Sequence, residues 1–580
     1  MVLHRHHRRS DQLSQADVGV QPASGLRRGQ HDARHGPALI RLVRKSLLLA
    51  ALLTTVQPSS AQSPPKLVVV VSFDQFRGDY PQRFAPVYPT KGGFRTLMAN
   101  GAVFTACRYE HANNITGPGH ATLLTGCYPA RTGIVGNDFC DLASGKCGYC
   151  AQDSAGVFGA RNMLVPTLGD VLRKISPRSK VVGVGLKDRA AILMAGPSAT
   201  TCVWYDANAR RWTSSAAYPQ PSWLSSINAT VNVDRYIGAV WSPLPLPSGL
   251  PVVPMDSVAE EGAFPGGNSA FPHRILDPSH PKFMASVLIS PFSMEMLFDV
   301  VTEVVDRENL GRDKSPDVLC VGVSTTDYIG HVFGPDSWEV LDVYARADRE
   351  IKDLLEHLNR RVGKNNYVLV VTSDHGVAPI PEVIRRQAEQ QRTTIDAGRI
   401  REVEIQVRID SALSTMLGPL APNSSYVREI YEPSIYLNWN AIGKADRARV
   451  IETTTRAVAS HPGIGIALSS DDVTQKRRPA AIDTATWNYI ARSTFAGRTG
   501  EVVMYPKPYW IIGGNVATHG TPYDYDRWVP MMWYGAGIAP LTSDIKCAPV
   551  DIAPTLARLL GVRLGDADGR PLPLNTTTRR

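Results

Sequence analysis

Four stretches of the chain are unbroken runs of apolar, largely β-branched residues. They cover residues 66–72, 181–186, 318–324 and 367–373. Runs of this kind suit strands that are buried on both faces of a parallel sheet. Between them, residues 165–174 and 338–358 have a helical pattern. Strands that alternate with helices predict an α/β fold with a doubly wound, mostly parallel sheet.

Two stretches, 203–290 and 380–512, interrupt this rhythm. The first is rich in Pro, Ser, Trp and Asn, and the second mixes short strands and helices with segments rich in Arg and Glu. We expect both to be insertions that form a cap over a sheet edge or over the mouth of an active site. The core then comprises residues 62–202, 291–379 and 513–580, and it ends with a strand at 529–534 and a helix with Asp551 as its N-cap.

The first 61 residues differ in composition from the rest of the chain. They hold nine Lys and Arg against three Asp, which gives +6 of the formal net charge of +9. The other residues therefore carry only +3, without the basic cluster that a nucleic-acid footprint needs. We expect no nucleic-acid binding beyond nucleotides as substrates.

Residues 41–61 have the pattern of a cleaved export signal. A basic group at 41–45 precedes an apolar run at 46–56, and small residues end at Ala61, the expected cleavage position. The run is too short to span a bilayer of about 30 Å. We therefore expect a periplasmic or secreted protein without stable membrane insertion. The alternative is a cytosolic protein whose first helix is apolar.

Eight cysteines fit an exported protein. Cys140, Cys147 and Cys150 lie in one Gly- and Asp-rich loop. This spacing resembles a metal knuckle but lacks a fourth ligand nearby, so we expect disulfides, with the pairing left open. Cys320, inside an apolar run, also fits a buried free thiol.

Carboxylates and imidazoles stand at the ends of the predicted strands. They are Asp74 after the first strand, Asp327 and His331 after the third, Asp374 and His375 after the fourth, and His519 before the last. Because ligands bind at the carboxyl ends of parallel strands, we expect these six side chains to converge. Both groups are ordinary zinc ligands, and six are enough for two ions. Taken singly, each has a structural explanation, such as a helix cap for Asp74.

Residues 113–122, Asn-Asn-Ile-Thr-Gly-Pro-Gly-His-Ala-Thr, contain a candidate nucleophile. The Gly-Pro-Gly turn leaves Thr116 at or beside the start of a helix, where free N–H groups favour a phosphoryl group. A hydroxyl needs a base or a metal to become a good nucleophile, and a neighbouring ion would supply this activation. The alternative is that Thr116 is only a helix cap.

Five motifs resemble the metal and nucleophile motifs of the alkaline phosphatase superfamily, in that family's order. They are Phe73-Asp74, the 116–122 segment, Thr326-Asp327 with His331, Ser-Asp-His-Gly at 373–376 and Thr-His-Gly at 518–520. The resemblance extends from about residue 66 to 570. It implies an alkaline phosphatase-like core.

The resemblance also implies two zinc ions and their ligands. One zinc would be held by Asp327, His331 and His519. The other would be held by Asp74, Asp374 and His375, with Thr116 on its open side.

Three further residues separate the branches of this superfamily. Asn137 resembles the Asn of members with a Thr nucleophile, and Lys187 with Arg189 resembles the Lys/Arg pair of the phosphate-insensitive bacterial alkaline phosphatases. Two cations aimed at a phosphate favour monoesters over diesters. The alternatives are that Lys187 and Arg189 form a solvated turn, and that the chain is a nucleotide pyrophosphatase or phosphodiesterase.

The sequence therefore predicts an exported alkaline phosphatase that hydrolyses phosphate monoesters through a phosphothreonine at Thr116. No Cys-x-Pro-x-Arg segment is present, which argues against a sulfatase. A binding protein that has lost catalysis is a competing hypothesis, but it does not explain the complete ligand set. We expect small-molecule phosphate esters as ligands and a monomeric protein.

Overall fold

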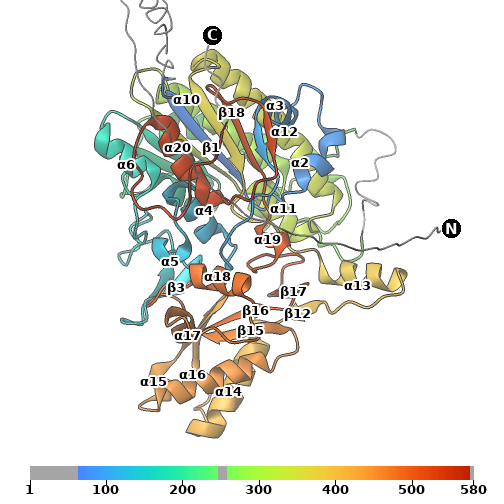
Figure 1. The fold of residues 1–580 in the computed structure, drawn as a ribbon. Coiled ribbons are helices and arrows are strands. Elements are labelled where there is room, and N and C mark those ends of the chain that lie inside the picture. Colours follow the sequence, from blue (N-terminus) through green and yellow to red (C-terminus); the bar gives the residue numbers. More distant parts are fainter. Residues whose placement is uncertain (1–62, 246–255, 257, 575–580) are drawn as a thin grey trace, which may run out of the picture. The chain divides into compact units, whose positions relative to one another are not determined.

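A nine-stranded sheet organises the part of the chain that the computed structural model describes, residues 63–245, 256 and 258–574. In sheet order the strands are β19 Leu541–Ser543, β2 Ala102–Phe104, β18 Met531–Gly535, β11 Tyr367–Thr372, β1 Leu67–Phe73, β10 Asp317–Val323, β5 Val181–Gly185, β6 Thr201–Asp206 and β7 Arg211–Thr213. The strands from β11 to β6 are parallel, whereas β18 and β7 run antiparallel to β11 and β6 (Figure 1). The predicted mostly parallel sheet is confirmed.

The four apolar runs of the sequence are the central strands β1, β5, β10 and β11. Every residue of these strands is buried, as expected for strands covered on both faces. The predicted bounds differ from the observed ones by at most one residue, because the runs are bounded by polar residues. The predicted export signal lies outside the described residues. Within residues 63–245 and 258–574, no helix is both long and apolar enough to cross a membrane.

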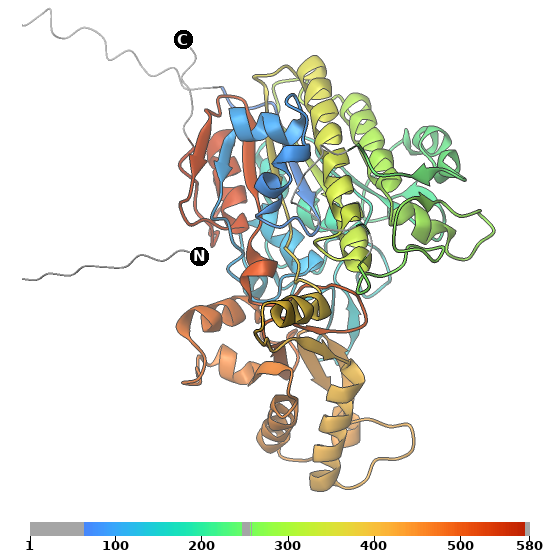
Figure 2. The same ribbon diagram turned by 90° about the vertical axis from the view of Figure 1, so that its right-hand side faces the viewer.

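Helices cover both faces of the sheet. Side chains that alternate along β1 separate two cores, with Val69 and Val71 in one and Val68 and Val70 in the other. The first core includes residues of α3 Gly93–Asn100, α10 Pro291–Arg307, α11 Thr325–Phe333 and α12 Trp338–Arg361. The second includes residues of α4 Thr116–Thr125, α6 Leu168–Ile175, α7 Asp188–Ala195 and α20 Ile552–Leu560. Figure 2 shows the long helices α10, in yellow-green, and α12, in yellow, side by side.

Both helices predicted from apolar spacing are present, as α6 and α12. Thr167 begins α6 with a capping box, in which its hydroxyl accepts from Asp170 N. Asp551 occupies the N-cap position of α20, as predicted, but its side chain makes no capping bond to that helix. Its oxygens instead accept from the backbone N–H groups of Ala548 and Arg570.

The first predicted insertion, 203–290, differs from the expectation. It begins inside β6 and continues into β7, so it extends the main sheet rather than leaving it. Its Trp212 and Trp241 are buried in the same core as α10 and α12. These two tryptophans therefore cover a face of the sheet, whereas Glu260 of the same stretch pairs with Arg386 of the second stretch at 2.9 Å. This packing depends on isolated aromatic residues. The sequence has no regular spacing of apolar residues here from which the packing could be predicted.

Residues of the second stretch, 380–512, form a separate lobe, which we call the cap. Its elements are α13 Pro381–Gln390, β12 Gly398–Ile400, α14 Glu402–Leu417, β13 Val427–Tyr431, β14 Ser434–Leu437, α15 Trp439–Ile442, α16 Arg447–Ala459, β15 Ile464–Ser469, α17 Ser470–Thr474, α18 Thr484–Ser493, β16 Val502–Pro506 and β17 Trp510–Ile512. Four of its strands form an antiparallel sheet in the order β13-β14-β16-β15, with its own apolar core under α14 and α16.

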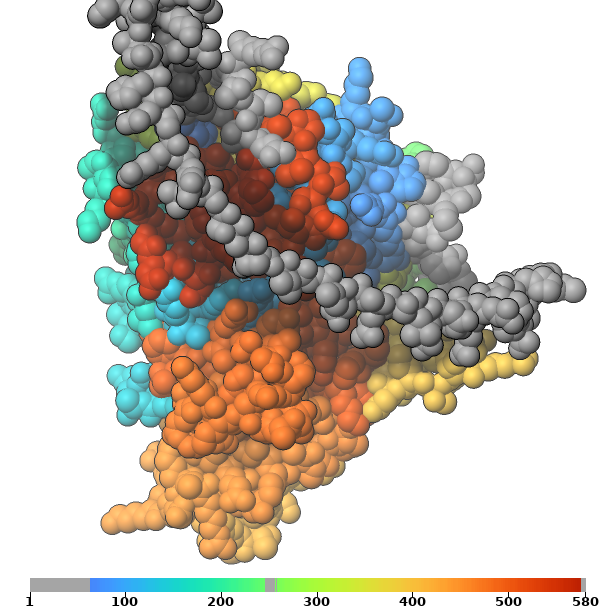
Figure 3. All heavy atoms as spheres, in the orientation of Figure 1, coloured from blue at the N-terminus to red at the C-terminus, as the bar shows by residue number. Residues whose placement is uncertain are grey.

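The helix α18 attaches the cap to the rest of the protein. Ala112 N donates to Tyr489 O, and Arg492 pairs with Glu110 at 2.9 Å. In the space-filling view, the orange surface of the cap meets the blue and cyan surface of the sheet domain (Figure 3). The segment that leads to Thr116 is therefore in direct contact with the cap.

The remaining elements are short. They are α2 Tyr80–Arg83, η1 Ala85–Val87, α5 Pro129–Thr132, β3 Asp138–Cys140, β4 Cys147–Tyr149, α8 Leu224–Thr230, η2 Val233–Tyr236, β8 Val240–Trp241, β9 His273–Arg274, α9 Phe283–Leu288, α19 Asp524–Arg527 and η3 Pro549–Asp551. Cys140 and Cys147 form a disulfide that closes the hairpin of β3 and β4. Cys150 and Cys320 are buried free thiols.

Candidate metal centre and nucleophile

The register of the central strands places the candidate ligands at one end of the sheet. Phe73 pairs with Val323 of β10, and Ser72 pairs with Thr372 of β11. Asp74, the start of α11 and the Ser373-Asp374 turn therefore follow three neighbouring strands at the same level. Asp74 N donates to Val323 O, which continues the ladder to the ligand itself.

Asp327, His331 and His519 form the first group of potential metal ligands. Asp327 and His331 lie four residues apart on α11, and the Nε2 of His331 is 3.1 Å from Asp327 Oδ1. The Nε2 of His519 is 3.6 Å from the same oxygen. His519 comes from the loop between β17 and α19, nearly two hundred residues further along the chain. The structure thus brings together the three residues predicted for one ion.

Asp74, Asp374 and His375 form the second group around the Nε2 of His375. This atom is 3.2 Å from Asp74 Oδ1 and 3.4 Å from Asp374 Oδ2. All three atoms are buried and lack a hydrogen-bond partner in the structure. Asp327 also reaches this group, since Asp74, Asp327 and His375 meet the geometric criterion for a metal site together. We place Asp327 in the first group because Asp327 Oδ1 is within 3.6 Å of the Nε2 atoms of both His331 and His519.

The three histidines share one hydrogen-bonding arrangement. The Nδ1 of His331 bonds to Ala517 O at 2.7 Å, that of His375 to Gly376 O at 2.9 Å, and that of His519 to Asn114 O at 2.9 Å. A carbonyl can only accept, so each Nδ1 carries the proton. Each Nε2, which faces the carboxylates, is then available as a metal ligand. The residues present therefore fit a pair of divalent cations.

The buried negative charge of the centre also favours the binding of cations. Asp74, Asp327 and Asp374 are at most 2% exposed. Burial opposes the charged form of His375, yet the Asp374 and Asp74 carboxylates raise its pKa to about 9. Burial and the neighbouring His375 lower the pKa of His519 to about 3. Three buried carboxylates are costly unless cations compensate them, and two divalent ions would do so.

Lys187 is the basic group closest to these carboxylates. It follows β5 at the N-terminus of α7, and its Nζ is 2.6 Å from Asp74 Oδ2 and 2.5 Å from Asp327 Oδ2. Burial opposes its charge, but Asp327 and Asp74 together raise the pKa of Lys187. Lys187 is only 8% exposed, so it is not part of a solvated turn.

Thr116 is the first residue of α4, as the Gly-Pro-Gly turn predicts. The N-cap position belongs to Ile115, and no side chain caps the helix, so the Thr116 hydroxyl is not a helix cap. The flanking residues touch both ligand groups. Asn114 O accepts from His519, and a Cβ on Gly119 would lie 2.3 Å from Asp374 O. Residues on both sides of Thr116 therefore contact one member of each group.

Asn137 and Arg189 each make one side-chain contact near the start of α4 or α7. Asn137 Oδ1 accepts from Gly117 N at 2.8 Å, which places this side chain at the N-terminus of α4. The guanidinium of Arg189 donates to Tyr149 Oη at 3.0 Å, and its Nε is buried without a partner. Tyr149 is therefore a positioning residue for Arg189, which the sequence analysis missed.

Two more residues of the centre were missed. Gln75 Nε2 donates to Asp327 Oδ1 at 2.8 Å, and its backbone has φ of 71°, a strained value for a residue with a Cβ. His120 Nδ1 lies 2.9 Å from Thr116 O and 3.2 Å from Asp374 Oδ2. Gln75 directly follows Asp74, and His120 comes four residues after Thr116. Their positions within these two motifs were the only sequence signal that could have indicated a role in the centre.

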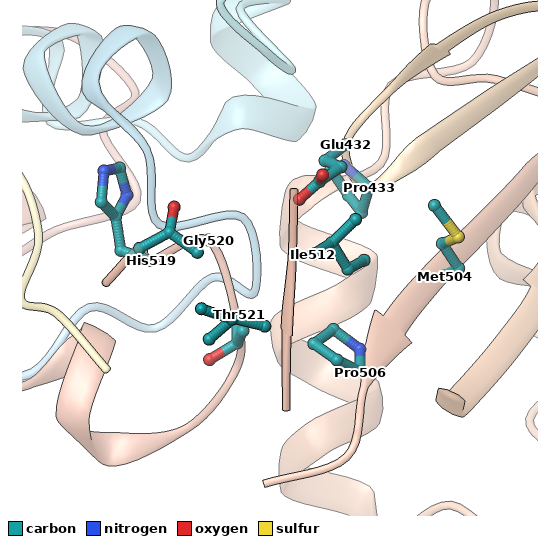
Figure 4. Close-up of a pocket in the computed structure, with 10 residues that line it drawn as sticks. Glu432, Pro433, Met504, Pro506, Ile512, His519, Gly520 and Thr521 are labelled. Carbon is teal, nitrogen blue, oxygen red and sulfur yellow. The ribbon is translucent and has the colours of Figure 1, made fainter. Parts of the chain in front are cut away.

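The cap contacts the loop that carries His519. A small cavity of about 10 Å³ separates His519, Gly520 and Thr521 from Glu432 and Pro433 of the cap. Figure 4 shows these two sides facing each other, with Ile512 beside Glu432 and Pro433 and with Met504 further away. Burial and the nearby Glu402 raise the pKa of Glu432 to about 8. This volume holds about one water molecule, so the cavity is a packing seam rather than a substrate site.

The sheet and the paired groups of candidate ligands at its end define a metal-dependent hydrolase with an alkaline phosphatase-like core. The alkaline phosphatase PafA, of known crystal structure, superposes with a TM-score of 0.78 and 26% identity, covering 88% of this chain and 98% of its own. Its fold is thus shared over nearly the whole described region.

Sequence comparison gives the family. Residues 68–523 match the family model described as type I phosphodiesterase / nucleotide pyrophosphatase, and the chain belongs to this family. The alkaline phosphatase PhoV of Synechococcus elongatus is 30% identical over 88% of this chain and 92% of its own length. A protein named calcium-transporting ATPase from Myroides odoratus is 29% identical over 89% and 96%. The predicted resemblance to the alkaline phosphatase superfamily is confirmed.

Proposed function

We propose that the chain is an exported alkaline phosphatase that hydrolyses phosphate monoesters through a covalent phosphothreonine at Thr116. One observation carries the proposal: residues on both sides of Thr116 contact the two groups of candidate metal ligands, and the histidines of these groups all leave Nε2 free of backbone bonds. Full-length similarity to a protein named alkaline phosphatase supports it. Export rests on the sequence pattern of residues 41–61.

The residues of the site act in a defined order. Arg189 and Asn137 hold the non-bridging oxygens of the phosphate, Asn137 through the Nδ2 donors that its bond to Gly117 leaves unused. Thr116 Oγ attacks phosphorus as the bond to the leaving alcohol breaks, and phosphothreonine forms. Water then cleaves the phosphothreonine, and inorganic phosphate leaves. Backbone N–H groups at the start of α4 stabilise the phosphoryl charge.

Two divalent metal ions, which we propose to be zinc, would be held by Asp327, His331 and His519 and by Asp74, Asp374 and His375. When bound, they would favour the ionised form of the Thr116 hydroxyl and stabilise negative charge on the leaving oxygen. They would also compensate the buried carboxylates that Lys187 contacts in this structure. Lys187 would then be available to bind a phosphate oxygen.

A phosphodiesterase or nucleotide pyrophosphatase is the second candidate, because the family model carries that description. Lys187 and Arg189 favour the monoesterase. A monoester has one more charged oxygen than a diester, and two cations, the buried Lys187 beside Asp74 and the partly buried Arg189 beside Tyr149, would bind it.

Replacing Thr116 by Ala tests the nucleophile. We expect phosphomonoesterase turnover to fall about 10³-fold or more, because the attacking oxygen is lost. Thr122→Ala is the matched control: this hydroxyl, on the same helix, only bonds to Pro118 O, so turnover stays near the wild-type value. Acid-quenched wild-type protein should carry phosphate on Thr116 by mass spectrometry. Near-wild-type turnover of Thr116→Ala would remove this residue from the mechanism.

A further inference from the structure

A short hairpin of β3 and β4, which form a sheet of their own, connects two of the proposed phosphate-binding residues. Asn137 directly precedes β3, and Tyr149, which holds Arg189 through a hydrogen bond of 3.0 Å, is the last residue of β4. Asp138 pairs with Tyr149 in the ladder. Beyond this pair, Cys150 N donates to Asn137 O at 2.8 Å. The open end of the hairpin therefore places Asn137 beside the residue that supports Arg189.

The Cys140–Cys147 disulfide closes the other end of this hairpin, where these two cysteines are the last pair of the ladder. Each strand has only three residues, so few backbone bonds join the two strands. A two-stranded hairpin is marginally stable at best without further support. The disulfide is therefore the covalent link that keeps the register of the hairpin, and with it the positions of Asn137 and Tyr149.

A reductant can reach this disulfide from solvent. Cys147 is partly exposed and lines a surface depression of about 640 Å³, whereas Cys140 is only 1% exposed. The other six cysteines are buried free thiols. Within residues 63–245 and 258–574, a mild reductant therefore has one disulfide to open, and the change in activity that it causes reports on the hairpin.

We propose that Cys140 and Cys147 are positioning residues for the phosphomonoesterase reaction. Their disulfide holds Asn137 and Arg189 in the geometry that binds the phosphate. In the reduced hairpin the strands separate, Tyr149 no longer fixes the guanidinium of Arg189, and the transferred phosphate is held less well. Full activity then requires an oxidising compartment, which fits the proposed export. This inference rests on the proposed phosphomonoesterase function and adds a redox requirement to it.

Reduction and re-oxidation of the wild type test the role of the disulfide. Tris(2-carboxyethyl)phosphine cleaves the S–S bond, each sulfur takes up a proton, and the phosphine gains an oxygen from water. We expect kcat/KM for an aryl phosphate monoester to fall about tenfold or more, because small displacements of positioning groups cost this much. Oxidised glutathione, which is itself reduced to two thiols, should restore the activity. Unchanged activity after complete reduction, verified by alkylation of Cys140 and Cys147, would overturn the proposal.

A comparison in two backgrounds separates positioning from general damage. Replacing Cys140 and Cys147 by Ser removes the disulfide and should lower kcat/KM as reduction does, and the reductant should not lower it further. In a background of Asn137→Ala and Arg189→Ala, the same two changes should have no effect beyond about twofold, since the groups that the disulfide positions are gone. An equal fold loss in both backgrounds would show that the disulfide only stabilises the fold.

Cys127→Ser is the matched control, because this buried thiol belongs to no disulfide. It should keep the wild-type activity and the wild-type response to the reductant. A loss of the response in this variant would assign the effect to the wrong cysteines. Lack of monoesterase activity in the oxidised wild type would overturn the proposed function, and this inference with it.

Discussion

Hydrogen bonds to backbone carbonyls orient the three histidines of this centre. His331, His375 and His519 come from a helix, a turn and a loop, yet each Nδ1 bonds to a carbonyl and each Nε2 faces the buried carboxylates. This common tautomer is the feature that a pair of cations requires. The residue types were predictable from the motifs, whereas the carbonyl partners were not, because they depend on how distant loops fold.

At the same residue scale, we propose that Lys187 and Arg189 select monoester over diester substrates. We expect Lys187→Ala and Arg189→Ala each to lower monoesterase kcat/KM about 10²-fold or more, and diesterase kcat/KM much less, because a diester lacks the second charged oxygen. Paired assays with an aryl phosphate monoester and diester measure the effect.

Lys180→Ala is the control for this pair. Lys180 stands just before β5, whereas Lys187 follows the same strand, and it pairs with Glu308 at 3.1 Å away from the metal ligands. Its replacement should leave both activities unchanged. Equal losses on the two substrates in the Lys187 and Arg189 variants would contradict the assignment of these residues to the second charged oxygen.

Elements of the fold position these residues through close backbone contacts. The helix α4 approaches the Ser373-Asp374 turn so closely that only glycine fits at position 119, where a Cβ would lie 2.3 Å from Asp374 O and 2.8 Å from Asp374 Cβ. The strands β1, β10 and β11 were predictable because their apolar runs are long. The short strands β2, β7 and β19 were not, since three residues carry too little pattern.

Gly119→Ala tests this contact. The added methyl group meets backbone that cannot move cheaply, so we expect a loss of about 1–3 kcal/mol in the free energy of unfolding. Turnover should also fall, since α4 carries Thr116 and the turn carries Asp374. Denaturant unfolding and monoesterase assays measure both effects.

Gly148→Ala provides the matched comparison, because a Cβ at that glycine has nothing within 4 Å. Its free energy of unfolding should stay within about 0.5 kcal/mol of the wild-type value. Unchanged stability and turnover in Gly119→Ala would show that α4 does not depend on this close approach.

At the scale of the whole molecule, candidate metal ligands follow three strands of the central sheet, and His519, which follows the cap in the sequence, joins them. The cap folds around its own core and meets the His519 loop across a seam lined by Glu432 and Pro433. The sequence indicated that residues 380–512 interrupt the sheet. It did not indicate that residues 203–290 would cover the sheet with tryptophans, because that packing has no regular period.

The central claim is that the six side chains hold two divalent cations beside Thr116. A crystal structure of the purified protein, with anomalous scattering recorded at the zinc edge, tests it most directly. We predict two peaks about 4 Å apart, one at Asp327, His331 and His519 and one at Asp74, Asp374 and His375, with ligand distances of about 2.0–2.2 Å. A single peak, or none within reach of these residues in metal-replete protein, would contradict the two-metal site.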